Sequence, residues 1–309
     1  MYAGVDPAIG FSFFISLLNK ERGIKMNEKV KRLYQILEEG VKNFEPSPEK
    51  FKAFLEMKAL MPRYSFHNLM VARAQYEGAT FLASFKKWKE LGRYVKKGQK
   101  AIYIFAPRFK KQEEEIDGEV QEVTKLAGFI AVPVFDVSQT EGEPLPIDRI
   151  KIELEGDCPE AAHIRKLAEE MARRDNCPVI YGDAKSNQGA NGYYSVDKHL
   201  IVVGDHLSPN HQAKTLVHEL VHSRVHRNPR KSSKKEQEIV AEGAAFVVCR
   251  YFGFDTSDYS FDYVYSWSGD EGQSVAKYGS IICDVAGAII KEAEEIQKEW
   301  SEQIVVRTA

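Results

Sequence analysis

The stretch that constrains this chain most is the motif His-Glu-Leu-Val-His at residues 218–222. On an α-helix, residues four apart differ by about 40° around the axis, so His218 and His222 project from one face, one turn apart. That arrangement suits two adjacent ligand positions on a tetrahedral zinc ion, and Glu219 lies beside them, where its carboxylate can act as a general base toward water. The flanking residues are mostly apolar, which indicates a buried helix, and a buried His-Glu-His set needs a partner such as a metal. We therefore predict a metal-binding helix that begins near Ser208.

A third ligand is expected from the next helix, predicted over residues 236–252. A catalytic zinc usually takes three protein ligands and leaves a fourth position to water. Glu238 and Glu242 lie four residues apart on one face of this helix, so one would bind the metal and the other would support a ligating histidine. A glutamate pair alone is more typical of a solvated helix face, but the apolar residues around these two argue against full exposure. From the residues alone either acid fits either role, and we expect one Zn²⁺ ion per chain.

A second feature is the basic, aromatic stretch 81–111. It holds ten Lys or Arg residues against one acid, a local charge of +9, and the next eleven residues, 112–122, hold six acids and no base. The net charge of the whole chain is −2, which excludes a uniformly basic nucleic-acid binder but permits such a patch. Cations that follow a phosphate backbone, interleaved with rings on which bases stack, are typical of single-strand binding. The alternative is a solvated lysine face over an aromatic core, and the spacing of Phe81, Phe85 and Trp88 favours such a core-facing stripe.

The remaining pattern predicts an α+β fold with two domains. Residues 26–140 combine helical periodicity with β-rich stretches at 101–107 and 128–137, which are typical of two strands of a long hairpin. The segment 138–146 has turn and linker composition. Residues 147–309 are expected to hold a few strands and several helices, among them the two that carry the metal-binding motifs.

Residues 1–25 are expected to be a non-native or disordered leader. Their apolar run IGFSFFISLL has ten residues, whereas a bilayer span needs about 20. No positive charge precedes the run, which makes it a poor signal peptide, and Met26 opens an amphipathic stretch typical of a natural start. Four scattered cysteines without a Cys-x-x-Cys pair favour a reducing cytoplasm, and no membrane partner is expected.

The helix pair that carries the motifs resembles a known family. The sequences HELVHSRVH and EIVAEGAAFVVCRYFG are similar to those of ImmA/IrrE-type zinc metallopeptidases, and more closely to the C-terminal domain of ArdC-like anti-restriction proteins. The resemblance implies a zincin-like metallopeptidase domain. Its functional residues would be the metal ligands His218, His222 and Glu238, the supporting acid Glu242 and the catalytic base Glu219.

The N-terminal half is similar to the single-stranded-DNA-binding domain of the same family. The turn LGRYVKKGQK at residues 91–100 matches the hallmark of that domain, with Gln99 where the family often has an acid, and RYSFHNLMVARAQ matches an earlier motif. The resemblance implies a helical and β-hairpin domain that contacts DNA. The contacts would come from Arg63, Asn68, Lys86, Lys87, Trp88, Arg93, Lys96, Lys97 and Lys100.

Three functions follow from these patterns. The resemblance implies a protein of a bacterial mobile element that binds single-stranded DNA and shields it from restriction, with a zinc peptidase site that acts on a protein bound to that DNA. In the second, the zinc is structural and DNA coating is the whole function. In the third, an ImmA-like protease acts on a repressor, and the basic stretch docks a protein.

Overall fold

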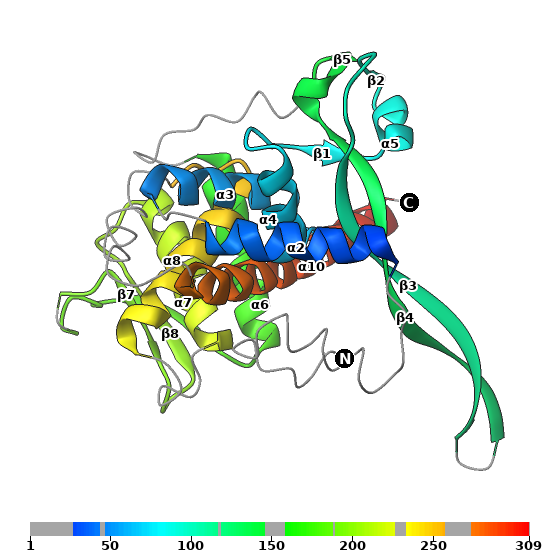
Figure 1. Cartoon of the computed structure of the whole chain (residues 1–309). Helices are drawn as coiled ribbons and strands as arrows, with labels where there is room; N and C mark the ends of the chain where they lie inside the picture. Colours follow the sequence, from blue (N-terminus) through cyan, green and yellow to red (C-terminus); the bar gives the residue numbers. More distant parts are fainter. Residues whose placement is uncertain are drawn as a thin grey trace. The chain divides into compact units, whose positions relative to one another are not determined.

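A computed structural model describes residues 27–43, 47–116, 119–145, 158–187, 189–225, 233–256 and 273–308 (Figure 1). The predicted leader, residues 1–25, lies outside the described residues. The fold is mixed α+β, as the sequence predicts, and the chain divides into two compact units. Unit 1 comprises Met1–Phe44 and His67–Pro144, and unit 2 comprises Glu45–Phe66 and Leu145–Ala309.

The division between the units differs from the predicted boundary at one segment. Residues Glu45–Phe66 belong to unit 2, although the sequence pattern groups them with the domain 26–140. The segment contains α3 (Pro48–Leu60), which packs against α8 (Lys234–Tyr251). Phe66 lies so close to Gly279 that a Cβ atom there would come within 2.5 Å of its ring. Contacts between residues far apart in sequence decide this grouping, and a local pattern does not record them.

Unit 1 is built around a long two-stranded ribbon. β3 (Ile102–Ile116) pairs antiparallel with β4 (Glu119–Asp136), which also pairs with the short β1 (Leu82–Ala83) (Figure 1). β3 and β4 are both longer than the strands that the sequence predicts. Their backbone pairing continues through charged residues that lack a β-type pattern. One apolar face of α2 (Glu28–Lys42) is buried, and its Tyr34 ring stacks on Phe105 of β3 with centroids 4.6 Å apart.

Two side-chain amides on α4 (Phe66–Gln75) bind the outer edge of β3. The amide of Asn68 accepts from the backbone N–H of Phe105 and donates to its carbonyl, each at 2.9 Å. Gln75, two turns further on, does the same at Tyr103, at 3.0 and 2.8 Å. The two amides supply the hydrogen bonds that another strand would otherwise make.

The basic segment of unit 1 is anchored at Asp136. The buried carboxylate of Asp136 accepts hydrogen bonds from the backbone N–H groups of Thr80, Phe81 and Ser138. Beyond β1 follow α5 (Phe85–Glu90) and β2 (Arg93–Val95), and β2 pairs antiparallel with β5 (Thr140–Gly142). A 3-10 turn, Val137–Gln139, joins β4 to β5. The hydrogen bonds to Asp136 and the pairing of β2 with β5 therefore hold the backbone that carries these lysines in place.

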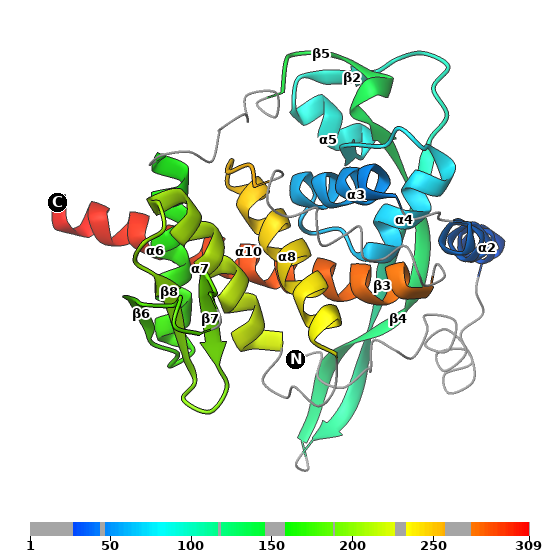
Figure 2. The same cartoon turned by 90° about the vertical axis from the view of Figure 1, so that its left-hand side faces the viewer.

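Unit 2 consists of a small sheet and a group of helices (Figure 2). The strands β6 (Val179–Gly182), β8 (Leu200–Gly204) and β7 (Gly192–Ser195) lie in that order, with β6 parallel and β7 antiparallel to β8. α7 (Pro209–Val225) packs against β7 and β8, α6 (Pro159–Arg174) and α8, and α8 packs against α10 (Gln273–Thr308). The part of the chain with described coordinates contains no helix that is both long enough and apolar enough to cross a membrane.

Candidate metal centre

The metal motif lies on a helix that is buried on nearly all sides. α7 begins at Pro209 and buries Leu216, Val217, Leu220 and Val221 against its neighbours. The helix that faces it, α8, starts at a capping box in which Ser233 and Glu236 bond each other's backbone N–H groups. The packing of α7 and the capping box of α8 therefore hold the two helices in place, and with them the polar side chains that lie between them.

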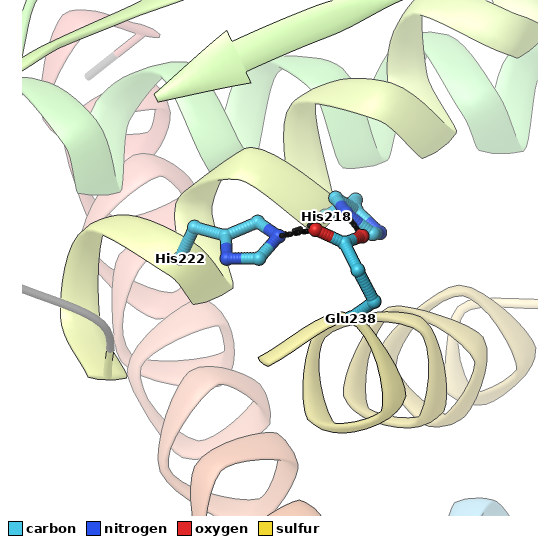
Figure 3. A group of neighbouring side chains, drawn as sticks. All are labelled: His218, His222 and Glu238. Atoms are coloured by element: carbon cyan, nitrogen blue, oxygen red, sulfur yellow. Dashed lines mark hydrogen bonds and ion pairs between the residues drawn. The ribbon is translucent and has the colours of Figure 1, made fainter. Parts of the chain in front are cut away.

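Three side chains converge between α7 and α8 (Figure 3). The Nε2 atoms of His218 and His222 lie 3.0 Å apart. The carboxylate of Glu238 places one oxygen 3.2 Å from Nε2 of His218 and the other 3.5 Å from Nε2 of His222. One ligand atom from each residue falls within 4.8 Å of the other two. Two imidazoles and a carboxylate are the protein ligands of many catalytic zinc sites, so the residues present fit a divalent ion.

The imidazoles and carboxylates of this cluster shift one another's pKa values. Burial alone would lower the pKa of His218, but the carboxylates of Glu238 and Glu242 outweigh it and raise that pKa to about 10. Burial would raise the pKa of Glu238, but hydrogen bonds from His218 and His222 lower it well below its ordinary range. A metal ion bound by these residues would have to displace a proton from the cluster, since its ligands are deprotonated.

Glu242 occupies the other side of His218. Its Oε1 lies 3.2 Å from Nδ1 of His218 and accepts a hydrogen bond of 2.8 Å from Nζ of Lys214. Burial would raise the pKa of Glu242, but His218 and Lys214 outweigh it and lower that pKa to about 2. The residues alone left the roles of the two acids open, and the family resemblance implied Glu238 as the ligand and Glu242 as the supporting acid. The structure brings Glu238 to the two Nε2 atoms and Glu242 to the remaining nitrogen of one ring.

Glu219 lies between the metal cluster and the sheet. It is buried, which raises its pKa, and it accepts a hydrogen bond from the backbone N–H of Tyr194 on β7. The close approach of strand and helix depends on Gly192, because a Cβ atom there would come within 2.5 Å of the Thr215 methyl group. A carboxylate that can accept a proton is thus held beside the edge of a β-sheet.

Lys214 was missed by the sequence analysis. The signal was present, because Lys214, His218 and His222 follow one another at intervals of four residues on α7. A lysine on a helix is usually solvated, so the spacing alone carries little weight.

The residues expected to contact DNA fall into two groups. Those with exposed side chains in unit 1 are Lys86, Lys87, Lys96, Lys97 and Lys100. Two of them have local partners: Lys87 pairs with Glu90 at 3.2 Å, and Lys96 donates to the carbonyl of Ser138 at 3.1 Å. These lysines provide the positive charge that the sequence predicts for this surface.

Of the remaining four residues, Trp88, Arg93 and Asn68 have structural roles, and Arg63 lies outside unit 1. Trp88 is fully buried and donates its indole N–H to the carbonyl of Phe135, which excludes a direct contact with DNA. Arg93 is half-buried and bonds Thr140 and the carbonyl of Gly142, so it joins β2 to β5. Asn68 uses its amide on β3, as described above. Arg63 lies in unit 2, exposed, with its guanidinium 3.4 Å from the carboxylate of Glu294.

Three rings of the basic stretch are exposed instead of Trp88. Phe85 is 60% exposed, Tyr94 57% and Phe109 52%. Phe85 and Tyr94 lie on α5 and β2, which pack against each other, and Phe109 lies on β3. Exposed rings beside lysines are the side-chain types on which single-stranded nucleic acids stack.

Two family models match the chain. Residues 26–135 match the N-terminal domain of anti-restriction factor ArdC, and residues 172–251 match the IrrE N-terminal-like domain. Both resemblances expected from the sequence are therefore confirmed, and the second match includes both helices of the metal cluster.

The individual proteins that match the chain have low sequence identity to it. An uncharacterized protein of Bacillus anthracis is 23% identical over 320 residues, which cover 89% of this chain and 54% of that protein. The chain thus spans about half the length of this curated relative. The metal-free crystal structure of the antirestriction protein ArdC from plasmid R388 is 20% identical, with a TM-score of 0.45 over 75% of this chain and 86% of that one. Its Mn(II)-bound structure is 18% identical, with a TM-score of 0.39 over 74% and 89%.

Proposed function

We propose that this chain, which joins a region matching the ArdC N-terminal domain to an IrrE N-terminal-like domain, is a zinc-dependent peptidase that also binds single-stranded DNA. The observation that carries the peptidase proposal is the convergence of His218, His222 and Glu238 with Glu219 beside them. In this arrangement three ligands leave room for a fourth, and the base lies next to them.

Each residue of the cluster has a defined task. His218 and His222, through Nε2, and Glu238, through its carboxylate, would hold the ion. A divalent ion bound there polarises a peptide carbonyl and lowers the pKa of a bound water. Glu219 takes a proton from the attacking water and passes it to the leaving amide nitrogen. Glu242, whose Oε1 lies 3.2 Å from Nδ1 of His218, restrains the orientation of that ring.

The sheet suggests how a substrate is held. β7 lies at one edge of the sheet, and its residue Tyr194 bonds Glu219 through the backbone. An extended peptide can add to such an edge through main-chain hydrogen bonds. A peptide bound along β7 would run past the base, so the proposed substrate is an extended segment of a protein.

Zinc is the proposed ion because two histidines and a glutamate are its usual catalytic ligands. Imidazole and carboxylate ligands also accept Mn(II) and Co(II), since affinity alone separates these ions poorly. The R388 ArdC protein has been crystallised with Mn(II). If the cells that produce the protein are grown with zinc, Mn(II) and Co(II) together, the purified protein is expected to contain about one zinc ion per chain.

The substitution Glu219→Gln tests catalysis. It keeps the shape of the side chain and removes the base, so hydrolysis should fall by at least about 100-fold while zinc and DNA binding persist. The assay is cleavage of proteins bound to single-stranded DNA, with and without that DNA, by zinc-loaded protein. Full retention of biological activity in this variant would favour the DNA-coating function with a structural zinc.

The DNA-binding proposal rests on the surface of α5, β2 and the turn after it. There the exposed rings of Phe85 and Tyr94 lie among six exposed lysines. Stacking on such rings contributes roughly 1–3 kcal/mol per base and needs no base sequence. Phe85→Ala and Tyr94→Ala should each weaken binding of a labelled oligonucleotide. Tyr181→Ala removes an exposed aromatic ring of unit 2 and is the matched control. Equal affinities in all three variants would refute the assignment.

We propose the cytoplasm of a bacterial cell that receives a mobile element as the setting. The four cysteines are free thiols, in keeping with a reducing compartment. There the DNA-binding unit would coat entering single strands and protect them from restriction, and the peptidase would act on a protein bound to the same strand. A repressor protease would instead use the basic surface for protein, and its binding to DNA would lack a steep salt dependence.

A further inference from the structure

Lys214 is a buried lysine next to the proposed metal centre. It lies on α7 one turn before His218, and its Nζ is 2.8 Å from Oε1 of Glu242. Lysine is rarely buried unless it is paired, because removing its charge from water is costly. The position of this lysine therefore calls for a local explanation.

The facing surfaces of α7 and α8 form an ordered series of contacts. Glu242 meets Lys214 and His218, and Glu238 meets His218 and His222. A single oxygen atom, Oε1 of Glu242, contacts both Nζ of Lys214 and Nδ1 of His218. The other oxygen, Oε2, and Nδ1 of His218 are both buried and have no hydrogen-bond partner in the described part of the chain. Lys214 thus donates the hydrogen bond that holds this carboxylate, and the 3.2 Å approach of Oε1 to Nδ1 of His218 is an ion-pair contact.

Lys214 also adds a positive charge to a centre that contains three carboxylates. A divalent ion and Lys214 together carry three positive charges, which match the carboxylates of Glu219, Glu238 and Glu242. Without Lys214, a carboxylate beside the metal ligands would lose its cationic partner in a buried site, which is strongly unfavourable. The carboxylate would then change its position or its hydrogen bonds.

We propose that Lys214 is a positioning residue of the metal centre: it holds Glu242 through Oε1 against Nδ1 of His218, so that Glu242 orients this ring and stays away from the ion. The inference rests on the metal site of the proposed function. It assigns Lys214 an effect on the metal that passes entirely through Glu242.

The test is Lys214→Met, a substitution that keeps an unbranched apolar side chain as far as the Cε position and removes the charged ammonium group. The control is Lys58→Met, which removes another buried lysine of unit 2 whose Nζ donates to the carbonyls of Pro62 and Tyr64. We expect Zn(II) to bind Lys214→Met about tenfold more weakly, at the lower end of the loss caused by disturbing a partner of a metal ligand. The visible absorption of bound Co(II), which reports ligand geometry, should change in Lys214→Met and stay unchanged in Lys58→Met.

Electrostatics alone predicts the opposite sign, because removing a cation near a divalent ion strengthens binding of the ion. Unchanged or tighter Zn(II) binding with a wild-type Co(II) spectrum would therefore overturn the inference. In a Glu242→Gln background, Lys214→Met should change the affinity by less than about twofold, and a full tenfold loss there would also overturn it. If the wild-type protein bound no stoichiometric metal, the proposed function would fail first, which separates the two outcomes. Circular dichroism of each variant verifies that folded protein is compared.

Discussion

The amide of Asn68 gives a prediction that separates folding from DNA binding. The family resemblance implies that Asn68 contacts DNA. In the structure, however, its amide nitrogen donates to the carbonyl of Phe105 and its amide oxygen accepts from the N–H of Phe105, each at 2.9 Å. Asn68→Ala removes two hydrogen bonds and leaves a backbone N–H and a carbonyl of β3 without partners. Each lost bond costs roughly 0.5–1.5 kcal/mol, and the unsatisfied groups add to it unless water reaches them. At this partly buried edge we expect a loss of about 2 kcal/mol in the free energy of unfolding.

A matched variant strengthens the test. Gln75 makes the same pair of bonds at Tyr103, at 2.8 and 3.0 Å, and has not been assigned a DNA contact. Urea unfolding should show similar losses for Asn68→Ala and Gln75→Ala. Fluorescence anisotropy with labelled single-stranded DNA, under conditions in which each variant is folded, should give wild-type affinity for both. If Asn68→Ala kept full stability and bound DNA more weakly, the structural role of Asn68 would be refuted.

Three further predictions follow. Gly192→Ala should lower thermal stability, by about 1–3 kcal/mol for overpacking, because the new Cβ would meet the Thr215 methyl group at 2.5 Å; Gly182→Ala, with open space around it, should be nearly neutral in the same melt. Burial lowers the pKa of His67 from 6.5 to about 4, so the unfolded chain binds the extra proton between these values. Stability should therefore fall as the pH drops from 6.5 towards 4, and His67→Gln should flatten this part of the profile of unfolding against pH. Lys96→Glu combined with Lys97→Glu should weaken single-strand binding and reduce its salt slope, and an unaltered slope would exclude that turn from the interface.

Local patterns predicted which side chains converge in the candidate metal cluster, but only some of the rings that are exposed in the basic stretch 81–111. The positions of His218, Glu219 and His222 follow from helix periodicity, and that geometry needs no knowledge of the rest of the fold. The choice between Glu238 and Glu242 depends on how α8 lies against α7, so local spacing could not decide it and only the family resemblance indicated Glu238. Lys214 shares the four-residue spacing, but nothing local indicates that its side chain is buried.

In the basic stretch 81–111, the local pattern predicted the burial of one aromatic ring correctly and that of another wrongly. The spacing of Phe81, Phe85 and Trp88 favoured a core-facing stripe, and Trp88 is indeed buried with its ring 5.6 Å from that of Phe81. Phe85 of the same stripe is exposed, because α5 is a single short helix that turns only part of its surface inward. Composition predicted a positive surface, but only the fold shows which rings a nucleic acid can reach.

The central claim is that His218, His222 and Glu238 hold one divalent ion. A zinc titration of the metal-free protein against a competing chelator, run beside Glu238→Gln and Glu242→Gln, tests it most directly. We predict one ion per wild-type chain, loss of stoichiometric binding in Glu238→Gln, and a dissociation constant about 10–100-fold higher in Glu242→Gln. Wild-type affinity in Glu238→Gln, or no stoichiometric ion in the wild-type chain, would contradict the account.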